Sequence, residues 1–265
     1  MEFLTIFLSG LLTLLSPAGI VIDKTGENIL RSQFKKVEFL QLRVDNPPSY
    51  QILQGKVEKV LLAGRGLFPL KDFRIAVLEL ETDPINVDIH SWQKKRPKLK
   101  QPLQAGVRVV LTQADINTAL HSPEVIDRLR NFSNHILSPQ ESRKIQRLEF
   151  INPQINLLAN NRLRLQITIR EIGYPEELNI TTESGLQVIS GRQLQLIEPI
   201  ILINNKPAPP RLVSAIATGI NNRLDLPQLE ANGITARILQ FHINPTQLEI
   251  ASFVRIEPRF LKNTR

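Results

Sequence analysis

The sequence predicts an α+β fold, in which a long and mostly antiparallel β-sheet is accompanied by two or three helices. Aliphatic and polar residues alternate over many segments, as in residues 162–170, where Leu163, Leu165, Ile167 and Ile169 alternate with polar neighbours. Successive side chains of a strand point to opposite faces, so this segment presents one aliphatic and one cationic face. About ten such segments follow one another without regularly interposed helices, which favours α+β over alternating strands and helices.

The first 22 residues form a separate segment. Residues 3–22 carry no charged side chain, and 20 helical residues span about 30 Å, the thickness of a bilayer core. The cations follow this run, beginning with Lys24 and Arg31, which favours a membrane anchor with that flank on the cytoplasmic side. A signal peptide cleaved near Ala18 and an ordinary buried helix are the alternatives. We predict a single domain over residues 23–265.

Strands are predicted next, with glycines and prolines between them. Residues 37–44 form a strand that stops before Pro47, and residues 51–62 and 73–81 form two more, separated by a turn at residues 64–66. A short strand at residues 85–89 follows.

Two irregularities predict that the sheet curls. The apolar positions slip by one residue at Val77-Leu78 and again at Ile238-Leu239, as they do at a β-bulge. Proline lacks an amide donor, so Pro153, Pro199 and Pro245 are predicted at strand corners.

The helices are predicted from capping residues and apolar stripes. Thr112, followed three residues later by Asp115, is typical of a helix start, and a second helix is expected from Ser122. Late in the chain an aliphatic stripe recurs at helical spacing, which is more typical of core packing than of a ligand groove. The stripe consists of Leu212, Ile216, Ile220 and Leu224.

Composition and motifs speak against catalysis. The chain has no cysteine, which excludes disulfides, thiolate catalysis and cysteine metal sites. Its four histidines, which are scattered, form no metal-binding motif, and no nucleophile elbow or phosphate loop occurs. We therefore predict a protein that is not an enzyme, with no catalytic residues, no metal and no cofactor.

The charge balance points to an anionic partner. The formal net charge is +8, with 33 Lys and Arg against 25 Asp and Glu, and the pI is near 9.9. Five cations cluster within residues 94–100, next to the single tryptophan, and such a cluster suits an anionic membrane surface. A nucleic-acid patch lacks the interleaved aromatic residues needed for base stacking, and a solvated loop is the other alternative. The membrane-contact candidates are Trp92, Lys94, Lys95, Arg96, Lys98 and Lys100.

Four segments resemble a known family. Residues 40–67, 78–88, 189–199 and 223–258 are similar to the LmeA-like phospholipid-binding family, in particular to its cyanobacterial branch. The resemblance implies a protein of the cell envelope that binds lipid and has no known catalytic residues. It also implies a tubular lipid-binding fold, in which a curled sheet wraps around helices and leaves an apolar groove. The basic start of an ordinary export signal is absent here, so the resemblance does not fix the side of the membrane.

Taken together, these observations predict a non-catalytic, membrane-associated protein that binds or handles phospholipid in an aliphatic groove. The expected partner is an anionic phospholipid or a membrane surface. The second hypothesis is a membrane-anchored scaffold that binds another protein, and the third is a nucleic-acid binder. The aliphatic residues could equally form a closed core and not a groove. The groove candidates are Leu163, Leu165, Ile167, Ile169, Leu248, Ile250, Val254 and Ile256.

Overall fold

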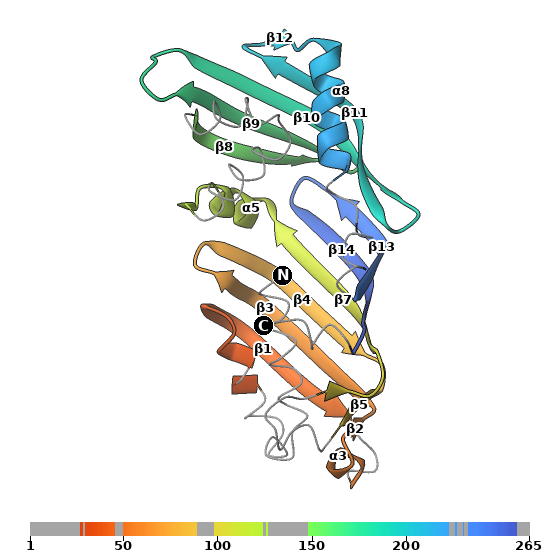
Figure 1. Ribbon diagram of the computed structural model, residues 1–265. Helices are drawn as coiled ribbons and strands as arrows, with labels where there is room; N and C mark the ends of the chain where they lie inside the picture. The colour runs from red at the N-terminus through yellow and green to blue at the C-terminus, as the bar shows by residue number, and fades with distance from the viewer. Residues whose placement is uncertain are drawn as a thin grey trace. The chain divides into compact units, whose positions relative to one another are not determined.

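The fold is known from a computed structural model (Figure 1), which describes residues 27–28, 30–45, 50–88, 98–123, 126, 148–222, 226, 230 and 233–258. The chain divides into two compact units. Unit 1 comprises Met1–Val110, Leu226–Gln240 and Ile250–Arg265, and unit 2 comprises Leu111–Asp225 and Phe241–Glu249. That residues 23–265 act as one domain stays a prediction.

Unit 1 is built on a six-stranded sheet with the strand order β1-β3-β4-β7-β14-β13. The pairs β1–β3, β3–β4 and β4–β7 are antiparallel, as the sequence predicts. The strands are β1 (Lys36–Asp45), β3 (Lys59–Leu70), β4 (Phe73–Thr82), β7 (Leu103–Thr112), β13 (Ile234–Ile243) and β14 (Gln247–Ile256).

Part of the core of unit 1 follows one face of this sheet. The register aligns Leu42, Leu62, Leu80 and Val107 across four strands, and the first two of these side chains are buried. A three-stranded sheet adjoins it, with β2 (Lys56–Val57), β5 (Ile85–Asp88) and β6 (Lys98–Leu99), after a short helix α3 (Tyr50–Leu53).

Unit 2 is built on a five-stranded sheet with the order β12-β11-β10-β9-β8. Its pairs are antiparallel and join neighbours in sequence. Helix α5 (Gln113–Leu120) contacts β8, and helix α8 (Pro210–Asn221) contacts β11. The strands are β8 (Leu148–Leu158), β9 (Arg162–Glu171), β10 (Glu177–Ile189), β11 (Gln193–Ile203) and β12 (Lys206–Pro207).

The mostly antiparallel β architecture and the start of α5 are confirmed. The Thr112 hydroxyl accepts a hydrogen bond from the Asp115 amide at 3.1 Å, which satisfies one of the free amides of the first turn. No helix in the described part of the chain has the length and apolar character to span a membrane. The predicted anchor at residues 3–22, and nearly all of the helix expected after Ser122, lie outside the described residues.

The turn predicted at residues 64–66 is wrong, because these residues lie inside β3. The β3–β4 hairpin turns instead at Lys71 and Asp72. Gly64 lies so close to Leu67 that an added Cβ would approach its Cδ1 to 2.6 Å, so this glycine serves close packing within the sheet. The predicted strand at residues 51–62 is also interrupted, by the end of α3 and the break between β2 and β3.

The bulge predicted at Val77-Leu78 is wrong as well. Both residues pair in unbroken register, with Arg65 and Gly64 on one side and with Val110 and Val109 on the other. The apolar positions slip there because both faces of β4 carry aliphatic side chains, and a half-buried face tolerates them. The bulge at Ile238-Leu239 in β13 stays a prediction.

Two of the predicted corners are bulges within continuous strands. Register shifts occur at Ile151–Gln154 in β8, and where Glu183–Gly185 of β10 faces β11. The residues before Pro153 and Pro199 have positive φ angles, 48° for Asn152 and 47° for Glu198. A bulge leaves a residue out of the ladder, so proline's missing amide costs little there. Pro245 does lie at a strand corner, the β13–β14 turn, where Asn244 Oδ1 accepts from the amide of Thr246 at 2.9 Å.

Candidate functional site

The main candidate site is one face of the unit 2 sheet, which we call the aliphatic face. Directly paired residues lie on the same face, and Ile167 pairs with Ile180 while Ile169 pairs with Phe150 and Leu178. Leu163 and Leu165 pair with Leu157 and Ile155 on the β8 side, whereas on the β10 side they face the polar side chains of Ser184 and Thr182. The aliphatic face comprises Phe150, Ile155, Leu157, Leu163, Leu165, Ile167, Ile169, Leu178 and Ile180.

The aliphatic face is only partly buried. Leu157 is 3% exposed, but the four β9 candidates are half-buried, and Leu178 is 46% exposed. This degree of exposure differs from that of a dry core, in which such side chains are covered on all sides. The face therefore has the chemistry of a surface that can take an apolar ligand.

Helix α8 is also only partly buried. The sequence predicts that its aliphatic stripe packs in the core, yet none of its residues is buried, and Leu212 is exposed. The helix is nevertheless anchored to the sheet, because Asn221 Oδ1 accepts a hydrogen bond from the amide of Leu196 at 2.9 Å. The described packing of α8 thus leaves its aliphatic stripe partly uncovered.

The opposite face of β9 is charged, but it is not a free cationic surface. Glu183 of β10 accepts hydrogen bonds from Arg164 at 2.9 Å and Arg162 at 3.2 Å, and Glu149 lies 2.8 Å from Arg170. The hydrogen bonds from Arg164, assisted by those from Arg162, lower the pKa of Glu183 despite some desolvation. The cationic face expected from β9 alone is therefore neutralised by carboxylates from its neighbours.

The second set of groove candidates lies on β14 and is divided between the units. Leu248 belongs to unit 2, whereas Ile250, Val254 and Ile256 belong to unit 1. The first three are half-buried, and Ile256 is 5% exposed, so it belongs to the core of unit 1. Leu248 thus shares unit 2 with the β9 candidates and the other three do not, and the role of all four in a groove stays a prediction.

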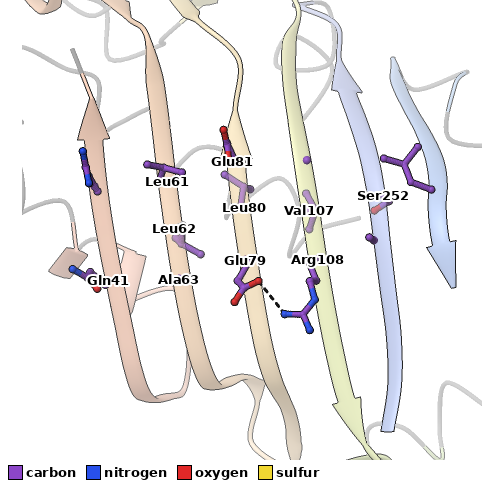
Figure 2. A pocket seen from close by; sticks show the side chains of 14 residues that line it. Gln41, Leu61, Leu62, Ala63, Glu79, Leu80, Glu81, Val107, Arg108 and Ser252 are labelled. Atoms are coloured by element: carbon purple, nitrogen blue, oxygen red, sulfur yellow. Dashed lines mark hydrogen bonds and ion pairs between the residues drawn. The ribbon is translucent and has the colours of Figure 1, made fainter. Parts of the chain in front are cut away.

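Unit 1 contains a hollow of about 610 Å³ that the sequence did not reveal (Figure 2). Arg108 and Glu79 are paired across β7 and β4 at 3.0 Å, and Arg65 lies 3.6 Å from the same carboxylate. Leu239 of β13, 71% exposed, adds an apolar side chain to the lining. The lining combines apolar side chains with charged groups, of which Arg108 and Glu79 are paired with each other. Only the cross-strand register could have revealed this hollow, since its residues come from six strands.

Most of the basic cluster lies outside the described residues, namely Trp92, Lys94, Lys95 and Arg96. Lys98 pairs with Asp88 in the ladder between β6 and β5, and Lys100, which follows, is exposed. A role of this cluster at a membrane surface stays a prediction.

Comparisons with known proteins bear on the whole chain. Among the described residues, no group of His, Asp or Glu side chains is arranged to hold a metal ion. Comparison with curated proteins and with solved structures gives no significant match. A family profile described as LmeA-like phospholipid-binding, however, matches residues 14–253, most of the chain. The chain therefore belongs to the LmeA-like phospholipid-binding family, and the resemblance noted in the sequence is confirmed.

Proposed function

We propose that this protein is a non-catalytic, membrane-associated phospholipid binder that holds acyl chains against the aliphatic face of unit 2. The observation that carries the proposal is the partial exposure of this face in a member of a phospholipid-binding family. Acyl chains need apolar contact and no directional hydrogen bonds, which a face of Leu and Ile side chains supplies.

In this proposal α8 forms one wall of the groove. Its aliphatic stripe contributes Ile216 and Ile220, beside which Val213 is also half-buried, and the helix contacts β11, the strand next to β10. An acyl chain held between helix and sheet would complete the burial of both, as in tubular lipid-binding proteins whose sheets wrap around helices. Each fully buried CH₂ group contributes about 0.8 kcal/mol, so a single acyl chain supplies ample binding free energy.

The headgroup stays outside the groove. The aliphatic face offers it no charged partner, and the charges of the opposite face are already paired with one another. Separately, the basic cluster of residues 92–100, whose cations are in excess, supplies an attraction to an anionic membrane surface.

The test is native mass spectrometry of the full chain purified without added lipid, together with extraction and analysis of any bound lipid. We expect a mass increment that corresponds to phospholipid and disappears after extraction. A chain that carries no lipid and takes up no fluorescent phospholipid from solution contradicts the proposal.

A further inference from the structure

The tip of the β9–β10 hairpin concentrates exposed apolar side chains. Ile172 is 56% exposed, Tyr174 is 61% exposed and Leu178 is 46% exposed, all within seven residues. In Figure 1 the hairpin forms a long loop at one end of the five-stranded sheet. Scattered exposed apolar residues are common on proteins, but a cluster at a loop tip indicates a contact with another apolar body.

The tip is held in shape by its own hydrogen bonds. The Tyr174 amide donates to the Glu171 carbonyl at 3.0 Å, and Gly173 turns the chain with a φ of +91°. At the base, Asn179 and Asn204 exchange two hydrogen bonds, one of 2.9 Å from the Asn179 amide to Asn204 Oδ1 and one of 2.8 Å from the Asn204 amide to the Asn179 carbonyl. The apolar side chains are therefore presented by a formed turn.

The end of the hairpin is apolar, and the residues that flank it are acidic. Glu171, Glu176 and Glu177 flank the apolar residues, while Arg170 is paired with Glu149 at 2.8 Å and with Glu177 at 3.4 Å. The carboxylates outnumber the one arginine here, so an anionic surface repels this end of the hairpin. The same end complements the exposed ammonium groups of zwitterionic phospholipid headgroups.

The aliphatic face continues to the tip. Ile167–Ile180 and Ile169–Leu178 are successive pairs on this face, and Leu178 is the member closest to the turn. A lipid at the tip thus meets an aliphatic path that continues along β9 to Leu163, while β10 contributes Leu178 and Ile180 to its first part.

We propose that the β9–β10 hairpin docks this protein on a zwitterionic phospholipid bilayer by inserting Ile172 and Tyr174, and that lipid enters the aliphatic face from there. This inference rests on the proposed function. An amphipathic tyrosine ring is favoured at the boundary between headgroups and acyl chains, and aliphatic neighbours are favoured just below it. The carboxylates remain at headgroup level, in water and beside the ammonium groups.

The test uses a single fluorescent label, which the absence of native cysteine makes possible. Full-length Tyr174→Cys is labelled with a nitrobenzoxadiazole dye, mixed with phosphatidylcholine vesicles and exposed to dithionite, which bleaches the dye in water. The matched control is Ile200→Cys, since Ile200 is similarly exposed, at 52%, and lies in β11, away from the tip. We expect vesicles to slow bleaching at position 174 by about tenfold or more, because the dye is buried at the headgroup boundary, and to leave position 200 unchanged.

Equal bleaching at the two positions overturns the inference, as does protection at position 174 without vesicles, which indicates a protein contact. Protection only on vesicles that contain anionic lipid overturns the zwitterionic assignment. Uptake of fluorescent phospholipid by the unlabelled chain is measured in parallel. Uptake without protection of the tip leaves the proposed function standing and removes this inference, whereas no uptake removes the proposed function itself.

An independent variant tests the path of the lipid. Ile172→Asn combined with Tyr174→Ser is expected to lower the rate of phospholipid uptake from zwitterionic vesicles by about tenfold, because less apolar surface is inserted. Tyr50→Ser combined with Ile200→Asn removes comparable exposed side chains elsewhere and leaves the rate unchanged. Equal rates for the two double variants contradict the inference.

Discussion

The carboxylate of Glu38 on β1 occupies the space that a Cβ atom on Gly66 of β3 would take. Gly66 also has a φ of +58°, which L side chains rarely adopt. The Glu38 side chain thereby passes over β3 and forms an ion pair with Arg74 on β4, at 2.9 Å. The hydrogen bond from Arg74 lowers the pKa of Glu38, which keeps the carboxylate charged and the ion pair intact.

Gly66→Ala is therefore expected to destabilise unit 1. The strained φ and the displaced carboxylate together lower the free energy of unfolding by about 1–3 kcal/mol, measured by thermal or urea unfolding. Gly106→Ala is the matched control, since its Cβ would approach nothing closer than the Glu81 carbonyl oxygen, at 4.0 Å. Adding Glu38→Ala to Gly66→Ala should recover only part of the loss, because the backbone strain remains. Equal melting temperatures for Gly66→Ala and Gly106→Ala would contradict the close approach of Glu38 to Gly66.

Glu183 gives the protein a predictable response to acid. Its folded-state pKa is lowered by hydrogen bonds from Arg164 and Arg162, below the value of about 4.3 for an unperturbed glutamate. It therefore contributes stability above the unfolded-state pKa, and this stability is lost as the pH falls through the lower folded-state pKa. We expect the melting temperature of the unmodified chain to fall more steeply below about pH 4.3 than that of Glu183→Gln. The control is Glu198→Gln, because the Glu198 side chain is 82% exposed and lies 3.7 Å from Arg162. Parallel curves for Glu183→Gln and the unmodified chain would exclude this role.

Alternation predicted the strands well because it depends only on which face of a strand is apolar. Residues 37–44 and 162–170 were placed correctly for this reason. Glycine and proline were less informative, since Gly66 serves a close approach between strands and Pro153 a bulge rather than a turn or corner. The same residue types serve both purposes, and only the strand register separates them.

The candidate site, too, could be predicted from the sequence only where it does not depend on the strand register. The sequence identified the aliphatic face of β9, because its residues alternate along one strand. It could not show that Glu183 would lie opposite Arg164 and neutralise the charged face, since that depends on the register of a hairpin. Nor did the pattern mark Ile172 and Tyr174, which lie in a turn where alternation stops.

The N-terminal segment is tested by membrane extraction. If residues 3–22 form an anchor, the full chain stays with membranes through a carbonate wash, whereas a chain that starts at Lys24 is extracted. N-terminal sequencing of the mature protein distinguishes the anchor from a cleaved signal peptide. An intact full chain in the soluble fraction rules out the anchor.

The basic cluster predicts a salt-dependent attraction to anionic vesicles. Replacing Lys94, Lys95, Arg96 and Lys98 with glutamine should weaken this binding by up to about 1 kcal/mol for each charge, and the difference should shrink as salt is added. Vesicle flotation of a chain that starts at Lys24 measures it without the N-terminal segment. An unchanged affinity of the glutamine variant for anionic vesicles would indicate that the cluster is an ordinary solvated loop.

Ile167→Asn separates a lipid groove from a closed core. In a groove, the amide replaces a half-buried side chain at a surface that water can reach, so lipid binding is lost while the melting temperature stays near that of the unmodified chain. In a core, the amide is buried without partners, which costs about 1–3 kcal/mol in addition to the lost packing. Melting and lipid content are measured on the same purified sample, and Val254→Asn applies the same comparison to β14.

Leu157→Asn is the internal control, because Leu157 lies on the same aliphatic face but is buried. It should lower the melting temperature strongly, and lose lipid only through unfolding. Three outcomes for Ile167→Asn are then distinct. A near-normal melt without lipid supports the groove, a melt as low as that of Leu157→Asn supports a core, and a near-normal melt with lipid retained places the acyl chains on another face. We expect the first outcome, because the β9 side chains remain half-buried where Leu157 on the adjacent strand is covered.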